Sequence, residues 1–326
     1  MTASEQQNLL PQSSWLTSRL RCPDCHARDL KTHNTTVRCG TCSAAFPVLG
    51  GKPVLIRSDN PLFPPRSYLG SLSRAEKRKS SSRPRLSPAR SVNLAYRRNL
   101  QAFAANLDKS QSTSVLVIGA GSQKDWLEGL LAKEPSVRIV YCDVDVRGKV
   151  DLFCDAHDVP FVDETFDGVV ASAVLEHVTS PERVVGEIHR VLRAQGLLYS
   201  EIPFLQQVHE GAYDFTRYTL SGHRRLLNRF EELSSGVVAG PATTLAWAIE
   251  HFALCLVPHS FLVTPIRAVV RTAFAWLKYL DFLLVRSPGA ADGASCTYFL
   301  GRKSASTRPD IDIVAKYTGL QSLRHV

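Results

Sequence analysis

Four cysteines near the start of the chain have the spacing of a metal site. Cys22 and Cys25 form one C-x-x-C pair, Cys39 and Cys42 form a second, and thirteen residues separate the pairs. Each pair places two thiolates on one tight turn, and two facing turns make the closed tetrahedral site that structural zinc prefers. Four sulfur ligands leave the metal no open position. The spacing therefore predicts a structural zinc, with no role for the two nearby histidines.

A glycine turn offers a second kind of site. The apolar run Val115–Ile118 leads into Gly119–Gly121 and then into a predicted helix. Glycines let the backbone pass close to a ligand, and a helix N-terminus offers free N–H groups to an anion. Asp143 ends the next apolar run, where a carboxylate can accept both hydroxyls of a ribose. The full dinucleotide fingerprint has a third glycine where this chain has Lys124, so the turn alone is also consistent with plain strand-to-helix packing.

The residues that follow resemble the class I S-adenosylmethionine-dependent methyltransferases, in particular their family of small-substrate catalytic domains. The likeness is carried by the glycine turn, by Asp143, by the string FCDAHDVPF that begins at Phe153, and by SAVLEHV at Ser172–Val178. It implies S-adenosylmethionine as cofactor, with the glycines under its methionine part and Asp143 at its ribose. It further implies that Asp155, followed by Ala156, hydrogen-bonds the adenine and that Ser172–Val178 lies beside the methyl group.

Two positions depart from the family pattern. The family often has an acid two residues before the first glycine, where this chain has Val117, and Gln123 occupies the turn in place of a glycine. Both departures bear on the tightness of cofactor binding, and they leave a degenerate, non-catalytic domain as an alternative. The presence of Asp143 and Asp155 argues against degeneration.

The cysteine segment also has a family likeness. From Leu20 to Ile56 it resembles the small zinc ribbons that, in eukaryotes, activate tRNA and protein methyltransferases. In bacteria, similar ribbons are often fused ahead of a methyltransferase domain. The resemblance implies a zinc ribbon of the methyltransferase-activator type in front of the catalytic domain.

The polar segment Val208–Thr219 is the candidate for binding the methyl acceptor. It follows a predicted strand, and in α/β sheets the ligand crevice lies at the carboxyl ends of the strands. Methyl transfer needs an acceptor that is aligned with the methyl group and, in some cases, deprotonated. We predict His209 as the base, with His177 as the second candidate, although a structural role for His177 is the commoner one. The other capable side chains either contact substrate or form a clamp in which acid and arginine pair: Tyr213, Asp214, Arg217 and Tyr218.

Strands and helices alternate from about residue 92 to residue 204, which is typical of a doubly wound α/β sheet. The methyltransferase resemblance makes this a Rossmann-like sheet of seven strands whose last strand, Cys296–Leu300, is antiparallel. The predicted strands are 115–118, 138–143, 168–172 and 196–202, and the predicted helices are 123–133 and 181–192. The predicted parts of the chain are a zinc ribbon (1–57), a flexible basic linker (58–91), a methyltransferase domain (92–303) with a helical lid insertion at about 204–290, and a tail (304–326).

The apolar stretch Thr243–Val285 has two interpretations. Charged residues and prolines interrupt every run of about 18 residues, so a transmembrane span is not expected. On a helix, Arg267, Arg271 and Lys278 fall within about 40° of one another, with Asp281 beside them. Such a helix is either a buried lid or lies on a membrane with a cationic stripe at the headgroups. The buried lid is the commoner outcome, whereas the membrane alternative would favour a lipid-linked acceptor.

The linker is strongly basic. Between Arg66 and Arg98 the chain has ten basic residues and one acid, a net charge of +9 that equals the formal charge of the whole protein. Such a cluster binds the phosphates of RNA or of anionic lipid, or serves as a solvated spacer. Its only aromatic residues, Tyr68 and Tyr96, are few for stacking on single-stranded bases. The solvated spacer is the commoner outcome, and nucleic acid is the less favoured partner.

Composition sets the outer bounds. With 326 residues, of which 44% are hydrophobic and 21% charged, the chain is neither disordered nor fibrous. Eight cysteines, four of them outside the cluster among apolar neighbours, fit a reducing compartment. We expect a cytoplasmic enzyme, or one peripheral to the inner face of a membrane, that methylates a small-molecule or lipid-linked acceptor, such as one of the cell envelope. The alternatives are an RNA methyltransferase and a non-catalytic scaffold, and the oligomeric state is not predicted.

Overall fold

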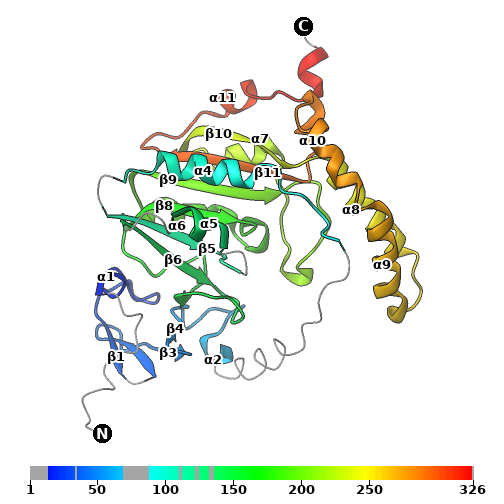
Figure 1. Ribbon diagram of the computed structural model, residues 1–326. Helices are drawn as coiled ribbons and strands as arrows, with labels where there is room; N and C mark the ends of the chain where they lie inside the picture. The colour runs from blue at the N-terminus through cyan, green and yellow to red at the C-terminus, as the bar shows by residue number, and fades with distance from the viewer. Residues whose placement is uncertain are drawn as a thin grey trace. The chain divides into compact units, whose positions relative to one another are not determined.

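The computed structural model describes residues 14–33, 35–68, 88–109, 112–121, 125–131 and 136–324 (Figure 1). Contacts divide the chain into two compact units. The first comprises Met1–Ser82, Leu107–Ala171 and Glu182–Leu197, and the second comprises Arg83–Asn106, Ser172–Pro181 and Leu198–Val326. The predicted ribbon therefore belongs to the same unit as the glycine turn and its strands.

A seven-stranded sheet with the order β10-β11-β9-β8-β5-β6-β7 forms the framework. β5 pairs in parallel with β6 and β8, and β10 pairs antiparallel with β11. The predicted Rossmann-like sheet with an antiparallel last strand is confirmed. β5 is almost wholly buried, and an apolar run such as TSVLVI is what a parallel strand covered on both faces requires. The strands are β5 (Thr113–Ile118), β6 (Val137–Asp143), β7 (Leu152–Phe153), β8 (Phe166–Ser172), β9 (Leu192–Pro203), β10 (Phe230–Ala239) and β11 (Cys296–Lys303).

The ribbon is a second, antiparallel sheet of four short strands. These are β1 (Leu30–His33), β2 (Thr36–Cys39), β3 (Ala45–Leu49) and β4 (Lys52–Pro53), and the short helices α1 (Ser14–Thr17) and α2 (Pro65–Tyr68) flank them. Between β3 and β4, Gly50 and Gly51 both have positive φ, at 57° and 77°. Two such residues in a two-residue turn match the twist of a hairpin, and only glycine adopts them without strain. Gly50 and Gly51 thus form the turn of an antiparallel β3–β4 hairpin.

The ribbon shares a hydrophobic core with the strands that follow the glycine turn. Val54 forms a parallel bridge with Phe153, and the Leu55 N–H donates to the Phe153 carbonyl at 2.8 Å. Val54 and Ile56 pack in one cluster with Ala120 of the glycine turn. The ribbon is thus part of the first unit's core.

Residues 58–68 correct the predicted linker. They were expected to be flexible, but Phe63 and Tyr68 pack on the core shared by the ribbon and the glycine turn. The Tyr68 hydroxyl donates to the Val144 carbonyl at 2.6 Å, and burial raises the pKa of that hydroxyl. The physical reason is that the burial of two aromatic rings contributes more free energy than the short segment loses in conformational entropy. Most of the basic residues of the predicted linker lie at 69–87, outside the described residues.

Five further helices accompany the strands of the main sheet. In the second unit, Asn93 caps the first turn of α4, because its Oδ1 accepts from the N–H groups of Ala95 and Tyr96. The predicted tail is also ordered in part and buries Ile313. The helices are α4 (Tyr96–Asn106), α5 (Asp125–Leu131), α6 (Pro181–Val191), α7 (Leu220–Leu226) and α11 (Asp310–Ala315).

A buried histidine on α7 predicts acid sensitivity. His223 is fully buried, with Nε2 3.1 Å from the Ser200 hydroxyl and Nδ1 3.4 Å from that of Thr297. Burial lowers the pKa of His223 to about 3. Because the unfolded chain binds this proton at about pH 6.5 and the folded chain does not, stability falls as the pH drops below 6.5. We expect His223 to cost about 2 kcal/mol of unfolding free energy between pH 6.5 and pH 5.

Urea unfolding of the wild type and of a His223→Asn variant at pH 7.5 and pH 5 measures this cost. The variant should lose less stability than the wild type over the same interval. Equal losses would show that other groups govern the acid response.

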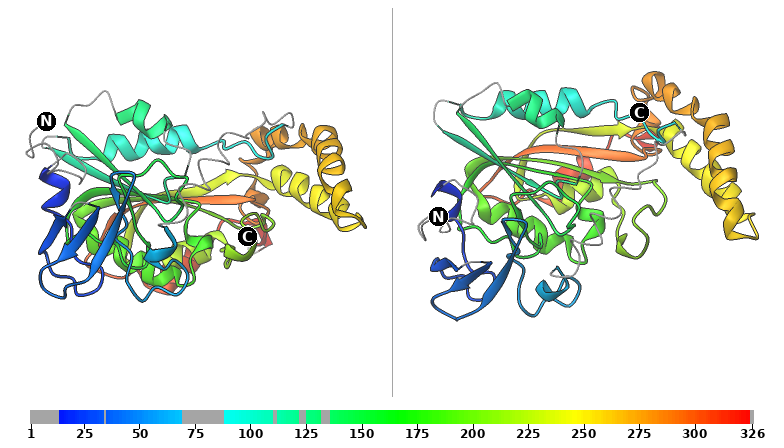
Figure 2. Two further views of the ribbon diagram at one scale, coloured as in Figure 1. Left: turned by 90° about the horizontal axis from the view of Figure 1, so that it is seen from below. Right: turned by 60° about the horizontal axis from the view of Figure 1, so that its bottom comes forward.

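A helical hairpin lies between β10 and β11 in the chain. α8 (Pro241–Cys255) runs outward, and α9 (Ser260–Phe274) returns along it and continues through η3 (Leu277–Leu280) and α10 (Asp281–Leu284) (Figures 1 and 2). We refer to residues 241–284 as the helical hairpin. β10 and α7 precede it, so the predicted helical lid at 204–290 is in part a strand of the main sheet.

The charged side chains of the hairpin are directed inward. Arg271 donates to Glu250 of α8 at 2.8 Å, and the Lys278 ammonium donates to the Ala89 carbonyl at 2.6 Å. The fully buried Asp281 accepts hydrogen bonds from three N–H groups at the start of α8, those of Gly240, Ala242 and Thr243. The expected cationic stripe therefore faces protein partners and not headgroups.

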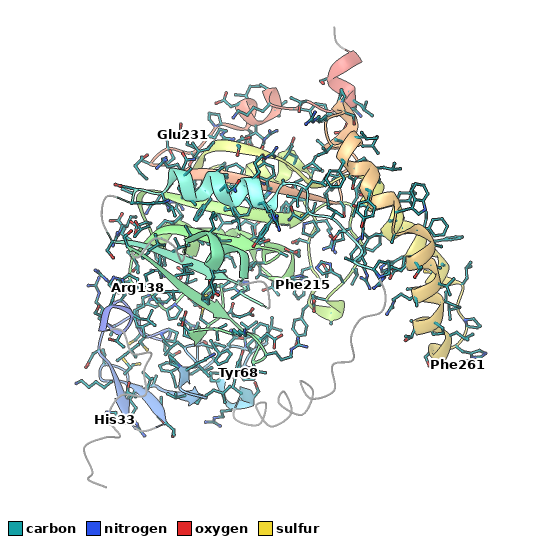
Figure 3. All side chains as sticks on the ribbon, in the orientation of Figure 1. His33, Tyr68, Arg138, Phe215, Glu231 and Phe261 are labelled. Atoms are coloured by element: carbon teal, nitrogen blue, oxygen red, sulfur yellow. The ribbon has the colours of Figure 1, made fainter. Side chains whose placement is uncertain are left out.

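The apolar side chains of the hairpin are directed outward. Phe252, Phe261 and Leu283 are 69%, 73% and 77% exposed, and α9 contains no buried residue (Figure 3). The favoured buried lid is therefore wrong, because the charges and not the apolar groups occupy the inner face. Among the described residues, one helical segment, Ser260–Leu284, is long and apolar enough to cross a membrane, which the sequence analysis did not expect.

Candidate functional site

The four ribbon cysteines converge on one point. The Cys22 sulfur lies 3.7 Å from that of Cys42, the Cys25 sulfur lies 3.6 Å from that of Cys39, and all four lie within 4.8 Å of one another. Sulfurs at about 2.3 Å from a tetrahedral zinc are about 3.8 Å apart. The four thiolates thus fit a structural zinc, which would cross-link the ribbon and leave no position for a substrate.

The two cysteine turns have the same backbone. The residues that follow them, His26 and Ser43, have positive φ of 63° and 62°. Their N–H groups donate back to the carbonyls of Cys22 and Cys39 at 2.9 and 3.0 Å. This repetition is expected of two matched knuckles that grip one ion.

The glycine turn is tied to Asp143. Gly119 and Gly121 have φ of 66° and 46°, which glycine adopts readily. The Gly121 N–H donates to Asp143 Oδ2 at 2.9 Å, while Oδ1 accepts from the Asp145 N–H. Among the described residues, a Cβ built on Gly121 would meet no atom nearer than the Gly119 carbonyl oxygen at 3.8 Å. Turn and carboxylate fit the approach of S-adenosylmethionine, while Gln123 and Lys124 lie outside the described residues.

Asp155 is held by the ribbon segment as well as by its own loop. Its Oδ1 accepts from the ring and backbone N–H groups of His157, and its Oδ2 accepts from the Asn60 amide at 2.6 Å. Burial opposes ionisation of this carboxyl, but the donors outweigh it and lower the pKa of Asp155. Its role at the adenine stays a prediction, as does that of the buried Ala156. Sequence reasoning missed Asn60 because the residue lies in the segment assigned to the linker.

In the second unit, three side chains from two strand ends meet. Glu176 and His177 lie in the 3₁₀ turn η1 (Leu175–His177) after β8, and His209 lies in the loop after β9. The Nε2 atoms of the two histidines are 3.1 Å apart. Glu176 Oε1 lies 3.7 Å from His177 Nε2 and 4.0 Å from His209 Nε2. The structure thus brings the two predicted bases together and adds a carboxylate.

Glu176 is buried without compensation. Its side chain has no exposed surface, and among the described residues neither carboxylate oxygen has a hydrogen-bond partner. Burial raises the pKa of Glu176 to about 8. An unpaired buried carboxylate is costly, so such a group requires a proton or a cation. The sequence analysis placed Glu176 beside the methyl group only as part of Ser172–Val178 and assigned it no role.

A clamp orients His209. Arg217 grips Asp214 through two hydrogen bonds and donates to the Gln206 carbonyl at 2.8 Å. Asp214 Oδ2 accepts from the His209 N–H at 2.9 Å and lies 3.3 Å from the ring Nδ1. Burial opposes ionisation of Asp214, but the Arg217 guanidinium outweighs burial and lowers the pKa of Asp214 to about 2. Burial and the neighbouring His177 lower the pKa of His209. The clamp predicted as the alternative for Asp214 and Arg217 is confirmed, and their contact with substrate stays a prediction.

An open cavity of about 470 Å³ lies beside this loop. Its lining includes Val208, Phe215 and His251, and Phe215 is 44% exposed (Figure 3). Tyr213 is exposed too, and its carbonyl, rather than its ring, contacts His177 at 2.8 Å. The cavity has room for part of an acceptor. The predicted acceptor contacts of Tyr213 and Tyr218 remain predictions.

Glu201 was missed by the sequence analysis. It is buried in β9 and accepts from the Tyr199 hydroxyl at 2.5 Å, from the Ser172 hydroxyl at 2.7 Å and from the Asn93 amide. These donors tie the end of β8 to β9 and to the start of α4. An acid inside the apolar run Leu197–Ile202 was the available signal, because a buried glutamate is almost always paired with hydrogen-bond donors or a positive charge.

Comparison with known proteins adds the family. Residues 133–200 match the model of a family described as a methyltransferase domain. The chain is an S-adenosylmethionine-dependent methyltransferase. The matched segment contains Asp143, Asp155 and Glu176, and the family supports the enzyme over the non-catalytic scaffold. A search of curated proteins finds no match.

Solved structures of low similarity share parts of this architecture. An S-adenosylmethionine-dependent methyltransferase from Archaeoglobus fulgidus is 14% identical over 64% of this chain and 93% of its own, with a TM-score of 0.40. Phosphoethanolamine N-methyltransferase 2 from Haemonchus contortus is 13% identical over 64% of this chain and 52% of its own, also with a TM-score of 0.40. The [4+2]-cyclase SpnF is 17% identical over 69% of this chain and 86% of its own, with a TM-score of 0.39. At this distance we draw nothing on substrate from them.

Proposed function

We propose that this methyltransferase acts on a lipid-linked acceptor at the surface of an anionic membrane. The observation that carries the proposal is the helical hairpin, whose apolar side chains are exposed while its charges are satisfied internally. A water-soluble acceptor would give no reason for this arrangement.

The exposed apolar side chains of the helical hairpin are suited to contact with the hydrocarbon of a membrane. On α9 and its continuation, Phe261, Val269, Trp276 and Leu283 are all more than half exposed. At about 100° per residue, Phe261 and Val269 of α9 lie within one sector of about 80°, on the side away from Arg267 and Arg271. A contiguous exposed apolar face of this kind marks an interaction surface. Aromatic and aliphatic side chains on a helix that lies in a bilayer interface are a common means of attachment.

Charge supports an anionic membrane. The basic stretch Arg66–Arg98 carries a net charge of +9. Within it, Arg90 lies 3.4 Å from Glu250 and 4.5 Å from the centre of the Trp247 ring, both on α8. Basic residues next to a membrane-bound helix contribute about 1 kcal/mol each near anionic lipid. The proposed location is therefore peripheral, on a membrane that carries negative lipid.

The chemistry of the reaction is an in-line displacement. S-adenosylmethionine, when bound, supplies a methyl group on a sulfonium. Asp143 and the glycine turn would hold the cofactor, and the cluster of Glu176, His177 and His209 would receive the acceptor group. The clamp of Asp214 and Arg217 keeps His209 in position for this task.

Vesicle flotation tests the membrane contact. The full chain should float with vesicles of phosphatidylcholine and phosphatidylglycerol and less well with phosphatidylcholine alone. A Phe261→Asp/Leu283→Asp double variant should bind at least about 100-fold more weakly, because each buried side chain contributes about 1.5–3 kcal/mol. Ile311→Asp, at an exposed apolar residue of α11, is the matched control and should float like the wild type.

Transfer of label from S-adenosylmethionine tests the acceptor class. Incubation with a membrane extract should place the labelled methyl group in the organic phase. Equal flotation of the double variant and the wild type, with label only in water-soluble products, would contradict the lipid-linked acceptor. Salt-sensitive labelling of RNA would support the RNA alternative instead.

A further inference from the structure

We infer that Glu176, His177 and His209 form a binding site for a divalent transition-metal ion, which in turn binds a hydroxyl group of the acceptor. The use of this ion rests on the proposed methyl transfer, but its binding does not and is tested separately. The hydrogen-bond partners of each histidine ring decide which of its two nitrogens carries the proton.

His177 presents a lone pair to the cluster. Its Nδ1 lies 2.8 Å from the Tyr213 carbonyl, which only accepts hydrogen bonds, so the proton of the neutral ring is on Nδ1. Nε2 is then unprotonated and faces His209. A backbone carbonyl that fixes the tautomer in this way is the usual outer contact of a metal-binding histidine.

His209 is arranged in the same way. Its Nδ1 lies 3.3 Å from the carboxylate of Asp214 and 3.4 Å from the side-chain nitrogen of Gln206. The Asp214 carboxylate, which Arg217 holds in place, is the nearer group and only accepts hydrogen bonds, so it favours the proton on Nδ1 and the lone pair on Nε2. Carboxylate, histidine and metal in series are a recurring arrangement that raises the basicity of the ligand. Two lone pairs 3.1 Å apart repel each other unless a proton or a cation lies between them.

Glu176 distinguishes the proton from the metal ion. A proton shared by the two histidines would leave both oxygens of the buried carboxylate without a partner. An ion bound by all three side chains satisfies the two lone pairs and the negative charge together. One cation thus serves all three groups, whereas a proton on Glu176 or between the two histidines serves only part of the cluster.

The distances fit such an ion. Separations of 3.1, 3.7 and 4.0 Å between the three ligand atoms define a triangle. Its centre lies about 2.1 Å from each corner, within the range of metal bonds to histidine nitrogen and carboxylate oxygen. Two imidazoles and one carboxylate suit zinc, iron(II), cobalt(II) or manganese(II), and three protein ligands leave a position for a substrate oxygen.

The ion would make the acceptor an alkoxide. A hydroxyl bound to a divalent ion has a lowered pKa and releases its proton to solvent. Its oxygen then forms a bond to the methyl carbon while the carbon–sulfur bond breaks and its electron pair returns to sulfur. The sulfonium becomes a neutral thioether and the acceptor becomes a methyl ether. The site therefore selects a hydroxyl group on the acceptor, and the lipid link of that acceptor rests on the proposed function.

Cobalt(II) is the probe that separates this site from the ribbon. Added to full-length protein with zinc in the ribbon, cobalt should give the visible bands of a nitrogen and oxygen site without a thiolate charge-transfer band. Elemental analysis should find about two metal ions per chain, one of them zinc. Glu176→Gln and His209→Ala should each weaken cobalt binding by more than about 100-fold and leave the zinc.

The controls separate a lost ligand from a lost fold. His251→Ala changes a histidine of the same unit that is not a ligand and should bind cobalt like the wild type. Circular dichroism and S-adenosylmethionine binding should be the same in every variant. A folded wild type that binds cobalt only with a thiolate band, or Glu176→Gln and His209→Ala variants that bind it like the wild type, would overturn the inference. Neither result depends on the acceptor, so a failure of the lipid proposal remains distinguishable.

Discussion

Replacing Cys39 by serine will remove the zinc and unfold the ribbon. The four sulfurs already lie at the separations of a zinc tetrahedron, and structural zinc contributes about 10–16 kcal/mol of apparent binding free energy in small domains. The ribbon strands have two to five residues each and cannot bury enough apolar surface to persist without the ion. We expect a Cys39→Ser variant that retains no zinc and melts at least about 10 °C lower.

The damage should reach the cofactor site. Val54 and Ile56 share a core with Ala120 of the glycine turn, and Asn60 holds Asp155. Loss of the ribbon therefore removes packing from the glycine turn and a hydrogen bond from Asp155. Binding of S-adenosylmethionine should weaken together with stability.

Zinc analysis, thermal melting and calorimetry measure these effects. Cys255→Ser is the matched control, because Cys255 is exposed at the end of α8 and should be replaced without effect on zinc or melting. A Cys39→Ser protein that melts and binds cofactor like the wild type would show that the ribbon is a passive appendage.

Asp281→Ala will open the helical hairpin. The Asp281 carboxylate is fully buried and accepts from three N–H groups at the start of α8. Charge-assisted hydrogen bonds contribute about 1.5–3 kcal/mol each, and a helix N-terminus favours a negative charge. Alanine leaves the three donors buried without an acceptor. We expect a loss of about 4 kcal/mol in the stability of the hairpin.

Hydrogen exchange of the α8 amides measures that loss locally. The amides of α8 should exchange much faster in Asp281→Ala, while those of β5 should not change. Asp310→Ala is the control, since Asp310 is mostly exposed and pairs with Arg225 at 3.2 Å, an arrangement of about 0.5 kcal/mol. Equal protection of α8 in Asp281→Ala and the wild type would contradict the capping role.

The parallel strands could be predicted from the sequence because they are buried on both faces. β5 and β8 are short, nearly continuous apolar runs, and each ends close to the residue expected. β10 was missed because its burial is mixed along the strand and its residues, FEELSSGVVA, show no strict alternation. Its place in the sheet depends on the partner β11, about 60 residues later, and pairing at that distance leaves no local signal.

The hairpin shows what periodicity leaves undetermined. The sequence placed Arg267, Arg271 and Lys278 on one face, which is correct, but an amphipathic pattern does not say which face points inward. The outcome was decided by Glu250 and by the carbonyl of Ala89, partners that a helical projection does not contain. The same holds for Glu176, whose partners His177 and His209 come together only when the ends of two strands do.

Binding of S-adenosylmethionine tests the central claim most directly. Calorimetry on the folded, zinc-loaded chain should give a dissociation constant on the order of micromolar, since methyl transfer at cellular cofactor levels needs no tighter site. Asp143→Ala should weaken binding by about 100-fold, because it removes the predicted acceptor of the ribose hydroxyls and the partner of the Gly121 N–H. Asp143→Asn, which keeps the shape, should lie between the two. A folded, zinc-loaded wild type that does not bind the cofactor would contradict the assignment of this chain as a methyltransferase.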